Sequence, residues 1–88
     1  MPPEPDNLFL SVYVASAEGV LWEGAAQSVS SANRDGPFDV LPQHARFITM
    51  LSDTPLTVRP LSGDTQTFAL RRAVMHVRDN TVAVYVGI

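Results

Sequence analysis

Alternation of apolar and polar positions dominates this chain and predicts strands rather than helices. Residues 81–88 show it most clearly, since every second residue is valine or isoleucine, and residues 8–15 alternate in the same way. No window of 11 residues repeats with the period of a helix. The pattern predicts that Val82, Val84 and Val86 are buried in one core, while Ala83 and Tyr85 face the other way.

Turn signals separate the apolar segments at intervals of about 8 to 12 residues. The clearest fall at residues 16–19, 33–36, 52–55, 62–64 and 79–80, and further breaks are expected at Gly24 and at residues 41–43. This spacing predicts an all-β fold, a flattened β-sandwich or barrel of about eight to ten short antiparallel strands. Residues 25–32 contain one large apolar side chain, Val29, so we expect them to form an edge strand or a bulged strand.

The length of 88 residues leaves room for one domain with one core. Residues 1–7 contain three prolines and two acidic residues, which predicts a flexible lead-in to a domain at residues 8–88. No segment approaches the roughly 18 apolar residues that a membrane-spanning helix needs.

Composition excludes several classes of function. The net charge of -3 argues against nucleic acid or anionic lipid as the main partner. The chain has no cysteine, and its two histidines lack carboxylates at a zinc-binding spacing, so we expect no metal and no cofactor. All six basic residues are arginine, which excludes the lysine chemistry of phosphate-binding loops and Schiff bases. Adjacent Arg71 and Arg72 are expected on opposite faces of a strand rather than in one basic patch.

The segment from Gly36 to Leu51 is the least regular part of the chain. Prolines at 37 and 42 bracket an apolar run, and His44 leads into a second one. Because proline ends strand pairing, we expect an extended piece, a bend at residues 41–43 and an apolar return. His44 then has two compatible interpretations, a partner contact or a hydrogen bond to a turn carbonyl that shapes the bend. A general acid–base role with Asp39 or Asp53 lacks any sign of a pocket, so an enzyme is not expected.

Three segments together resemble one known family. They are LSVYVASAEGVLWEG at 10–24, DGPFDVLPQHARFITML at 35–51 and FALRRAVMHVRDNTVAVYV at 68–86. In this order they resemble the N-terminal β-sandwich domain of the epsilon subunit of rotary ATP synthases, called delta in mitochondria. The middle segment is the most specific, and the resemblance covers residues 8–88.

The chain departs from the family pattern at several positions. Pro37 stands in place of an acidic residue, Asp39 and Gln43 in place of glycines, and Arg46 in place of a proline, while Arg72 and Ala73 replace a glycine pair. The family continues into two C-terminal helices, whereas this sequence ends at Ile88. The expectation is a chain that supports assembly and coupling but neither inhibits ATP hydrolysis nor binds nucleotide.

The resemblance implies a non-catalytic central-stalk subunit. Its partners would be the gamma subunit and the ring of membrane c subunits, and it would couple proton or sodium transport to ATP synthesis. It would lie on the cytoplasmic face of a bacterial plasma membrane and touch the membrane only through the complex. The positions implied as contacts are Ser16, His44 and Thr49, with Phe38, Val40 and Met50 near them. The alternative is a free-standing β-sandwich adaptor outside any ATP synthase.

Overall fold

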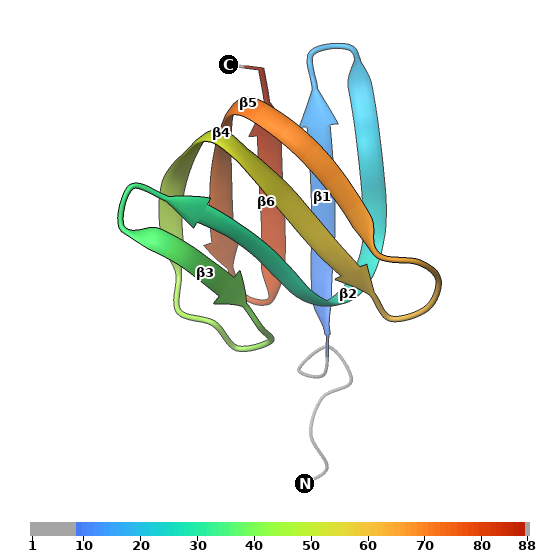
Figure 1. The fold of residues 1–88 in the computed structure, drawn as a ribbon. Helices are drawn as coiled ribbons and strands as arrows, with labels where there is room; N and C mark the ends of the chain where they lie inside the picture. The colour runs from blue at the N-terminus through green and yellow to red at the C-terminus, as the bar shows by residue number, and fades with distance from the viewer. Residues whose placement is uncertain (1–8, 88) are drawn as a thin grey trace, which may run out of the picture.

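The computed structural model describes residues 9–87, so the expected lead-in at residues 1–7 lies outside the described part of the chain. Six strands make up the fold (Figure 1). They are β1 (Leu10–Ser16), β2 (Gly19–Asn33), β3 (Gly36–Val40), β4 (Phe47–Pro60), β5 (Gln66–Arg78) and β6 (Thr81–Val86). No helix able to cross a membrane is found within residues 9–87.

The strands form one sheet that closes on itself. Its order is β1-β6-β5-β4-β2-β3, and an additional pairing of β1 with β2 completes a barrel of five strands, with β3 added at the edge of β2. The all-β, barrel-like class is therefore confirmed. One pairing departs from the antiparallel expectation, since β1 and β6 run parallel. These two strands lie far apart in the sequence, so no local turn signal reveals their pairing.

Six strands, of which β2, β4 and β5 are long, stand where eight to ten short ones were expected, in part because one turn signal proved to be a bend within a strand. Residues 52–55 read as a turn, yet β4 continues through them, with Asp53 at a φ of 49° and pairing to β5 intact on both sides. Such a bend lets one strand pass from one layer of a barrel to the other. Figure 1 shows β4 and β5 curving side by side at this point.

The bend also changes the prediction for Arg71 and Arg72. Both side chains are exposed, and together they line one shallow hollow with Asp53 and Gly87. The expectation that these arginines point to opposite faces is wrong, because regular alternation is interrupted where β5 bends beside Asp53.

The segment at residues 25–32 was expected to be an edge strand or a bulged strand, and the structure shows the bulged form in a central position. It belongs to β2, which pairs with β3 and β4 on its two sides after a register shift between Ala26 and Ser28. Val29 is fully buried there. The small side chains of this segment suit a central, bulged position in which neighbouring strands approach closely.

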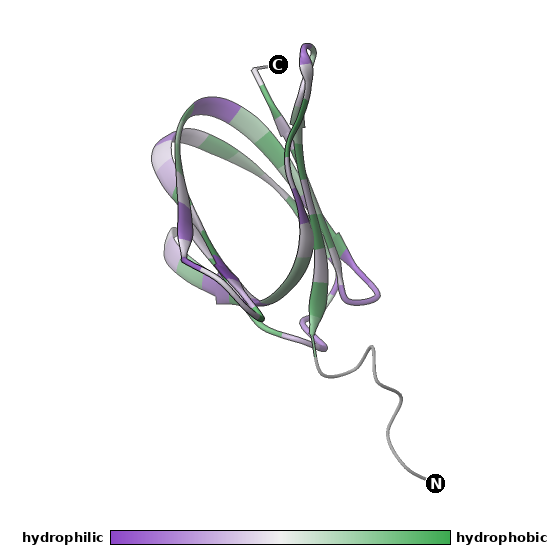
Figure 2. Cartoon of the chain, turned by 90° about the vertical axis from the view of Figure 1, so that its right-hand side faces the viewer, coloured by the Kyte–Doolittle hydropathy of each residue, from purple (hydrophilic) through white to green (hydrophobic). Residues whose placement is uncertain are grey.

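The core lies between the two layers of the barrel, which Figure 2 shows edge-on. Val82 and Val84 are fully buried and Tyr85 is 47% exposed, as the alternation predicted, whereas Val86, also expected in the core, is only partly buried and packs against it. Burial of such side chains stabilises the fold by roughly 25 cal/mol per Å² of apolar surface. The other large, fully buried side chains are Leu10, Val12, Val14, Val29, Val40, Leu51, Leu56, Val58, Met75 and Val77.

Candidate partner-binding site

The irregular segment folds as its sequence predicted. Strand β3 ends at Val40, residues 41–46 form a loop, and β4 returns from Phe47. The amide of His44 donates to the carbonyl of Leu41 at 3.1 Å, and Gln43 takes a φ of 68°. We call this segment loop 41–46. Its apolar residue Leu41 is 55% exposed.

His44 shapes this loop through two contacts of its ring. Its Nδ1 lies 2.7 Å from the carbonyl oxygen of Ala45, and its ring packs on Phe47 at a centroid distance of 5.0 Å. Phe47 in turn meets the edge of Phe38 at 5.6 Å. The interpretation of His44 as a residue that bonds a turn carbonyl is therefore confirmed. Asp39 bonds the hydroxyl of Ser30 instead of His44.

The six implied contact positions do not form one patch. Ser16 lies at the β1–β2 turn, where its Oγ accepts the amide of Glu18 at 3.2 Å, and this turn lies at the other end of the barrel from loop 41–46 (Figure 1). Thr49 is half-buried and its Oγ1 accepts the side-chain amide of Asn33 at 3.0 Å. Val40 is fully buried, so the structure gives it a role in the core beneath the loop. Contact of these positions with a partner stays a prediction.

A larger apolar surface covers the outside of one layer. Residues paired directly across neighbouring strands project from the same face of a sheet. One such row runs across β4, β5, β6 and β1 through Ile48, His76, Ala83 and Tyr13, and the next through Met50, Val74, Tyr85 and Ala15. We call these eight residues the outer patch. Ile48 is 68% exposed and Met50 50% exposed, and the rings of Tyr13 and Tyr85 meet edge to face at 6.3 Å.

Polar side chains border the outer patch on both sides. The row on the loop side contains Arg78 and Thr81, and the row on the other side contains Ser52 and Arg72. An apolar centre with a polar rim is the usual anatomy of a protein interface. An open hollow adjoins the patch between the β2–β3 turn and β4, and Ile48 and Met50 line part of it.

The outside of the opposite layer has a different character. Its central row crosses β3, β2, β4 and β5 and consists of Asp39, Ser30, Thr57 and Thr67. Arg59 adds a hydrogen bond from its Nη1 to Ser30 at 3.0 Å. This row is polar throughout, so the two outer faces of the barrel differ and the outer patch is the apolar one. Within residues 9–87 no three histidine, cysteine or acidic side chains are grouped so as to hold a metal ion.

Comparison with known proteins decides the family. Residues 9–87 match the family model of the ATP synthase delta/epsilon chain β-sandwich domain. The chain belongs to this family. It is 34% identical over 76 residues to the ATP synthase epsilon chain of Hydrogenovibrio crunogenus, covering 85% of this chain and 51% of that one. It is 36% identical over 58 residues to the epsilon chain of Micrococcus luteus, covering 66% of this chain and 64% of that one.

Solved structures support the same fold. A chain in the mitochondrial ATP synthase of Euglena gracilis superposes with a TM-score of 0.82 at 15% identity, over 90% of this chain and 51% of that one. A chain in the central stalk and c-ring structure from Tetrahymena thermophila gives 0.78 at 15% identity, over 90% of this chain and 63% of that one. This chain thus spans about half to two thirds of the length of these relatives. The epsilon chain is a non-catalytic subunit of ATP synthase, in agreement with the expectation that this protein is not an enzyme.

The outer patch is a surface that the sequence alone did not predict. Met50 alone among the six contact positions implied by the resemblance belongs to the outer patch. Ile48, Val74 and Tyr85 are patch residues that the resemblance did not imply. The sequence does contain an indication of this surface, because the strands with Tyr13 and Tyr85 are partly apolar on the face opposite the core as well. A strand that is apolar on both faces has one face left for a partner once the core is filled.

Proposed function

We propose that this chain is a non-catalytic module of the central stalk of a rotary ATP synthase. In this proposal the outer patch binds the gamma subunit and loop 41–46 faces the ring of c subunits. Membership of the epsilon family supports a place in the central stalk. The difference between the apolar and the polar outer face supports binding through the outer patch.

The observation that carries the proposal is the outer patch itself. Ile48 and Met50 on β4 and Tyr85 on β6 are each about half exposed or more, and β5, which lies between these strands, contributes no acidic side chain, arginine or lysine to the two rows. Exposed apolar groups that lie together and are bordered by polar residues favour a protein partner. Covering them with an apolar surface of gamma would remove them from water.

The architecture suits a mechanical role. The barrel is closed by the pairing of β1 with both β2 and β6, so hydrogen bonds connect all its strands around the core. A body of this kind deforms little under load, because its interior is packed and its strands are linked on both sides. The proposed function is to seat gamma on the c-ring, so that rotation driven by proton or sodium transport is coupled to ATP synthesis.

The proposed location follows from the assembly. The chain would lie at the cytoplasmic face of a bacterial plasma membrane and would reach the membrane only through the complex. Loop 41–46 and the β5–β6 turn lie at the same end of the barrel (Figure 1), and exposed Leu41 gives this end an apolar contact for a c subunit.

Binding to gamma tests the first part. Ile48→Glu places a charge in the outer patch, and Thr67→Glu places the same charge on the polar outer face, with both residues exposed on strands. We expect Ile48→Glu to weaken the affinity for recombinant gamma by about tenfold or more, since a buried unpaired charge is costly at an interface. Thr67→Glu should leave the affinity within about twofold. Equal effects of the two variants would contradict binding through the outer patch.

Cross-linking tests whether loop 41–46 faces the ring of c subunits. A photoreactive residue at Leu41 should form adducts with c subunits in an ATP synthase reconstituted with this chain. The same residue at Glu18, exposed in the β1–β2 turn at the other end of the barrel, should not. Adducts with c from Glu18 alone would reverse the proposed orientation. Failure of the unmodified chain to bind gamma at all would favour the alternative, an adaptor outside ATP synthase.

A further inference from the structure

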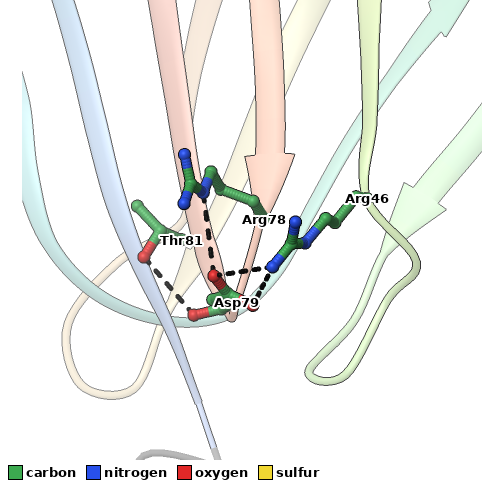
Figure 3. Close-up of polar contacts among 4 residues, drawn as sticks. All are labelled: Arg46, Arg78, Asp79 and Thr81. Atoms are coloured by element: carbon green, nitrogen blue, oxygen red, sulfur yellow. Dashed lines mark hydrogen bonds and ion pairs between the residues drawn. The ribbon is translucent and has the colours of Figure 1, made fainter.

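Loop 41–46 is attached to the β5–β6 turn through both residues at the centre of that turn. The side-chain oxygen of Asn80 accepts a hydrogen bond from the backbone amide of Gln43. The carboxylate of the neighbouring residue, Asp79, accepts a hydrogen bond from Nη2 of Arg46 at 3.3 Å. Figure 3 shows Asp79 between Arg46 and Arg78, whose Nε lies 3.7 Å from the same carboxylate.

The two attachments differ in their surroundings. Arg46 and Asp79 have side chains that are 69% and 64% exposed, and an ion pair in such a position is weakened by water and salt. Asn80 is half-buried, and its own backbone carbonyl accepts the amide of Ser11 at 2.8 Å. Asn80 therefore connects three segments, the start of β1, the β5–β6 turn and loop 41–46.

Both ends of the bond between Asn80 and Gln43 take unusual backbone conformations. Asn80 has a φ of 60°, which asparagine tolerates better than most residues. Gln43 has a φ of 68°, a region that favours glycine and is disfavoured for glutamine. A strained residue persists in this conformation only where its surroundings hold it. The acceptor that Asn80 offers to the Gln43 amide is such a restraint.

We propose that Asn80 is a positioning residue, whose side-chain oxygen holds loop 41–46 in the conformation that presents Leu41 and His44 to a partner. The restraint on the loop stands on the geometry alone. Its value for binding rests on the proposed function. A loop that is already ordered loses less conformational freedom when a partner binds it, so the restraint would favour binding.

Two substitutions at one position isolate the side-chain acceptor. Asn80→Gly keeps the positive φ and the backbone carbonyl that Ser11 uses, but removes the oxygen that Gln43 uses. Asn80→Asp keeps an oxygen at the same place. We expect Asn80→Gly to speed hydrogen exchange of the Gln43 amide by about tenfold, and Asn80→Asp to stay within about threefold of the parent chain. Exchange of the Val84 amide in the core should be unchanged in both variants.

Arg46→Gln serves as the matched control at the other attachment. It removes the exposed ion pair and leaves the Asn80 bond in place, so exchange of the Gln43 amide should change by less than about threefold. Unchanged exchange in Asn80→Gly would overturn the proposal. Equal loosening by Arg46→Gln would also overturn it, because the ion pair and not Asn80 would then hold the loop.

Binding to gamma and to the reconstituted c-ring complex tests the value of the restraint. We expect Asn80→Gly to weaken assembly by about fivefold with little change in melting temperature, and Asn80→Asp to restore it. A faster-exchanging loop with unchanged assembly would overturn the role in partner binding. If the parent chain does not assemble, the proposed function fails, while the exchange measurements still decide whether Asn80 holds the loop.

Discussion

The imidazole of His44 packs on the phenyl ring of Phe47, with centroids 5.0 Å apart and ring planes inclined at 45°. Phe47 also meets Phe38 edge to face, with an angle of 86° between the planes. His44 is therefore at one end of a row of three rings in contact, His44, Phe47 and Phe38, which connects loop 41–46 with β4 and β3. A residue chosen from the sequence for a possible contact thus has a structural role in the same loop.

Replacing His44 by alanine should affect both stability and binding. Loss of the ring contact and of the bond to the Ala45 carbonyl should lower the free energy of unfolding by about 1 kcal/mol. We expect the affinity for the reconstituted c-ring complex to fall by a larger free energy, because loop 41–46, which faces the c subunits in the proposed assembly, would lose its shape. Urea titration and calorimetric binding provide the two values. Affinity that is unchanged by His44→Ala would contradict a role for this end of the barrel in assembly.

The shape of loop 41–46 could be predicted from the sequence, whereas its attachment could not. Pro42 and the apolar runs around it correctly indicated a bend between two extended segments. The bond from Gln43 to Asn80 joins residues that are 37 positions apart in the sequence. Neither residue belongs to a motif that specifies such a pairing, so only the folded arrangement of β5 and β6 brings them together.

Glycine at position 43 should stabilise the chain. Gln43 has a φ of 68°, where an ordinary side chain costs roughly 1–2 kcal/mol and glycine costs nothing in steric strain. The greater freedom of glycine in the unfolded chain offsets roughly 0.5–1 kcal/mol of this gain. We therefore expect Gln43→Gly to raise the free energy of unfolding by about 0.5 kcal/mol in urea titration. A lower value than that of the parent chain would show that the glutamine side chain contributes more than its strain costs.

A charge at the centre of β6 should unfold the protein. Val84 is fully buried between strands β1 and β5, so Val84→Asp would place a carboxylate in the core without a partner. We expect loss of the cooperative thermal transition seen in the parent chain. Thr81→Asp in the same strand is the control, because Thr81 is exposed and paired with Arg78, and its stability should change by less than about 0.5 kcal/mol. A folded Val84→Asp variant would contradict the burial of this face.

The core and the outer patch differ in how far the sequence determines them. Alternation alone identified Val82 and Val84 as core residues, because one face of the strand carries no polar residue. The outer patch is assembled from the second faces of four strands, and one of its pairings, β1 with β6, is parallel and distant in sequence. Tyr13 and Tyr85 could be recognised individually as apolar, but their edge-to-face contact depends on that pairing. The continuity of β4 could not be predicted either, because residues 52–55, where the strand bends at Asp53, have the composition of a turn.

Two neighbouring serines of β2 should differ in their contribution to stability. The hydroxyl of Ser31 is nearly buried and donates to the carbonyl of Pro55 at 3.0 Å, close to the bend of β4. Backbone pairing between β2 and β4 extends as far as Ser30 with Thr57, so the Ser31 hydroxyl continues the connection beyond that pair. The hydroxyl of Ser30 lies on the polar outer face and interacts with exposed Asp39 and Arg59.

Substitution by alanine tests this difference with a matched pair. Ser31→Ala leaves the Pro55 carbonyl without its side-chain donor, so the free energy of unfolding should fall by about 1 kcal/mol, with an unchanged slope in urea. For a domain of this size that corresponds to a decrease in melting temperature of roughly 4–8 °C. Ser30→Ala should cost less than about 0.5 kcal/mol, because water can replace the lost partner on an exposed face. If Ser30→Ala were as damaging as Ser31→Ala, the polar row on the outer face, and not the buried hydroxyl, would hold β2 against β4 at the bend.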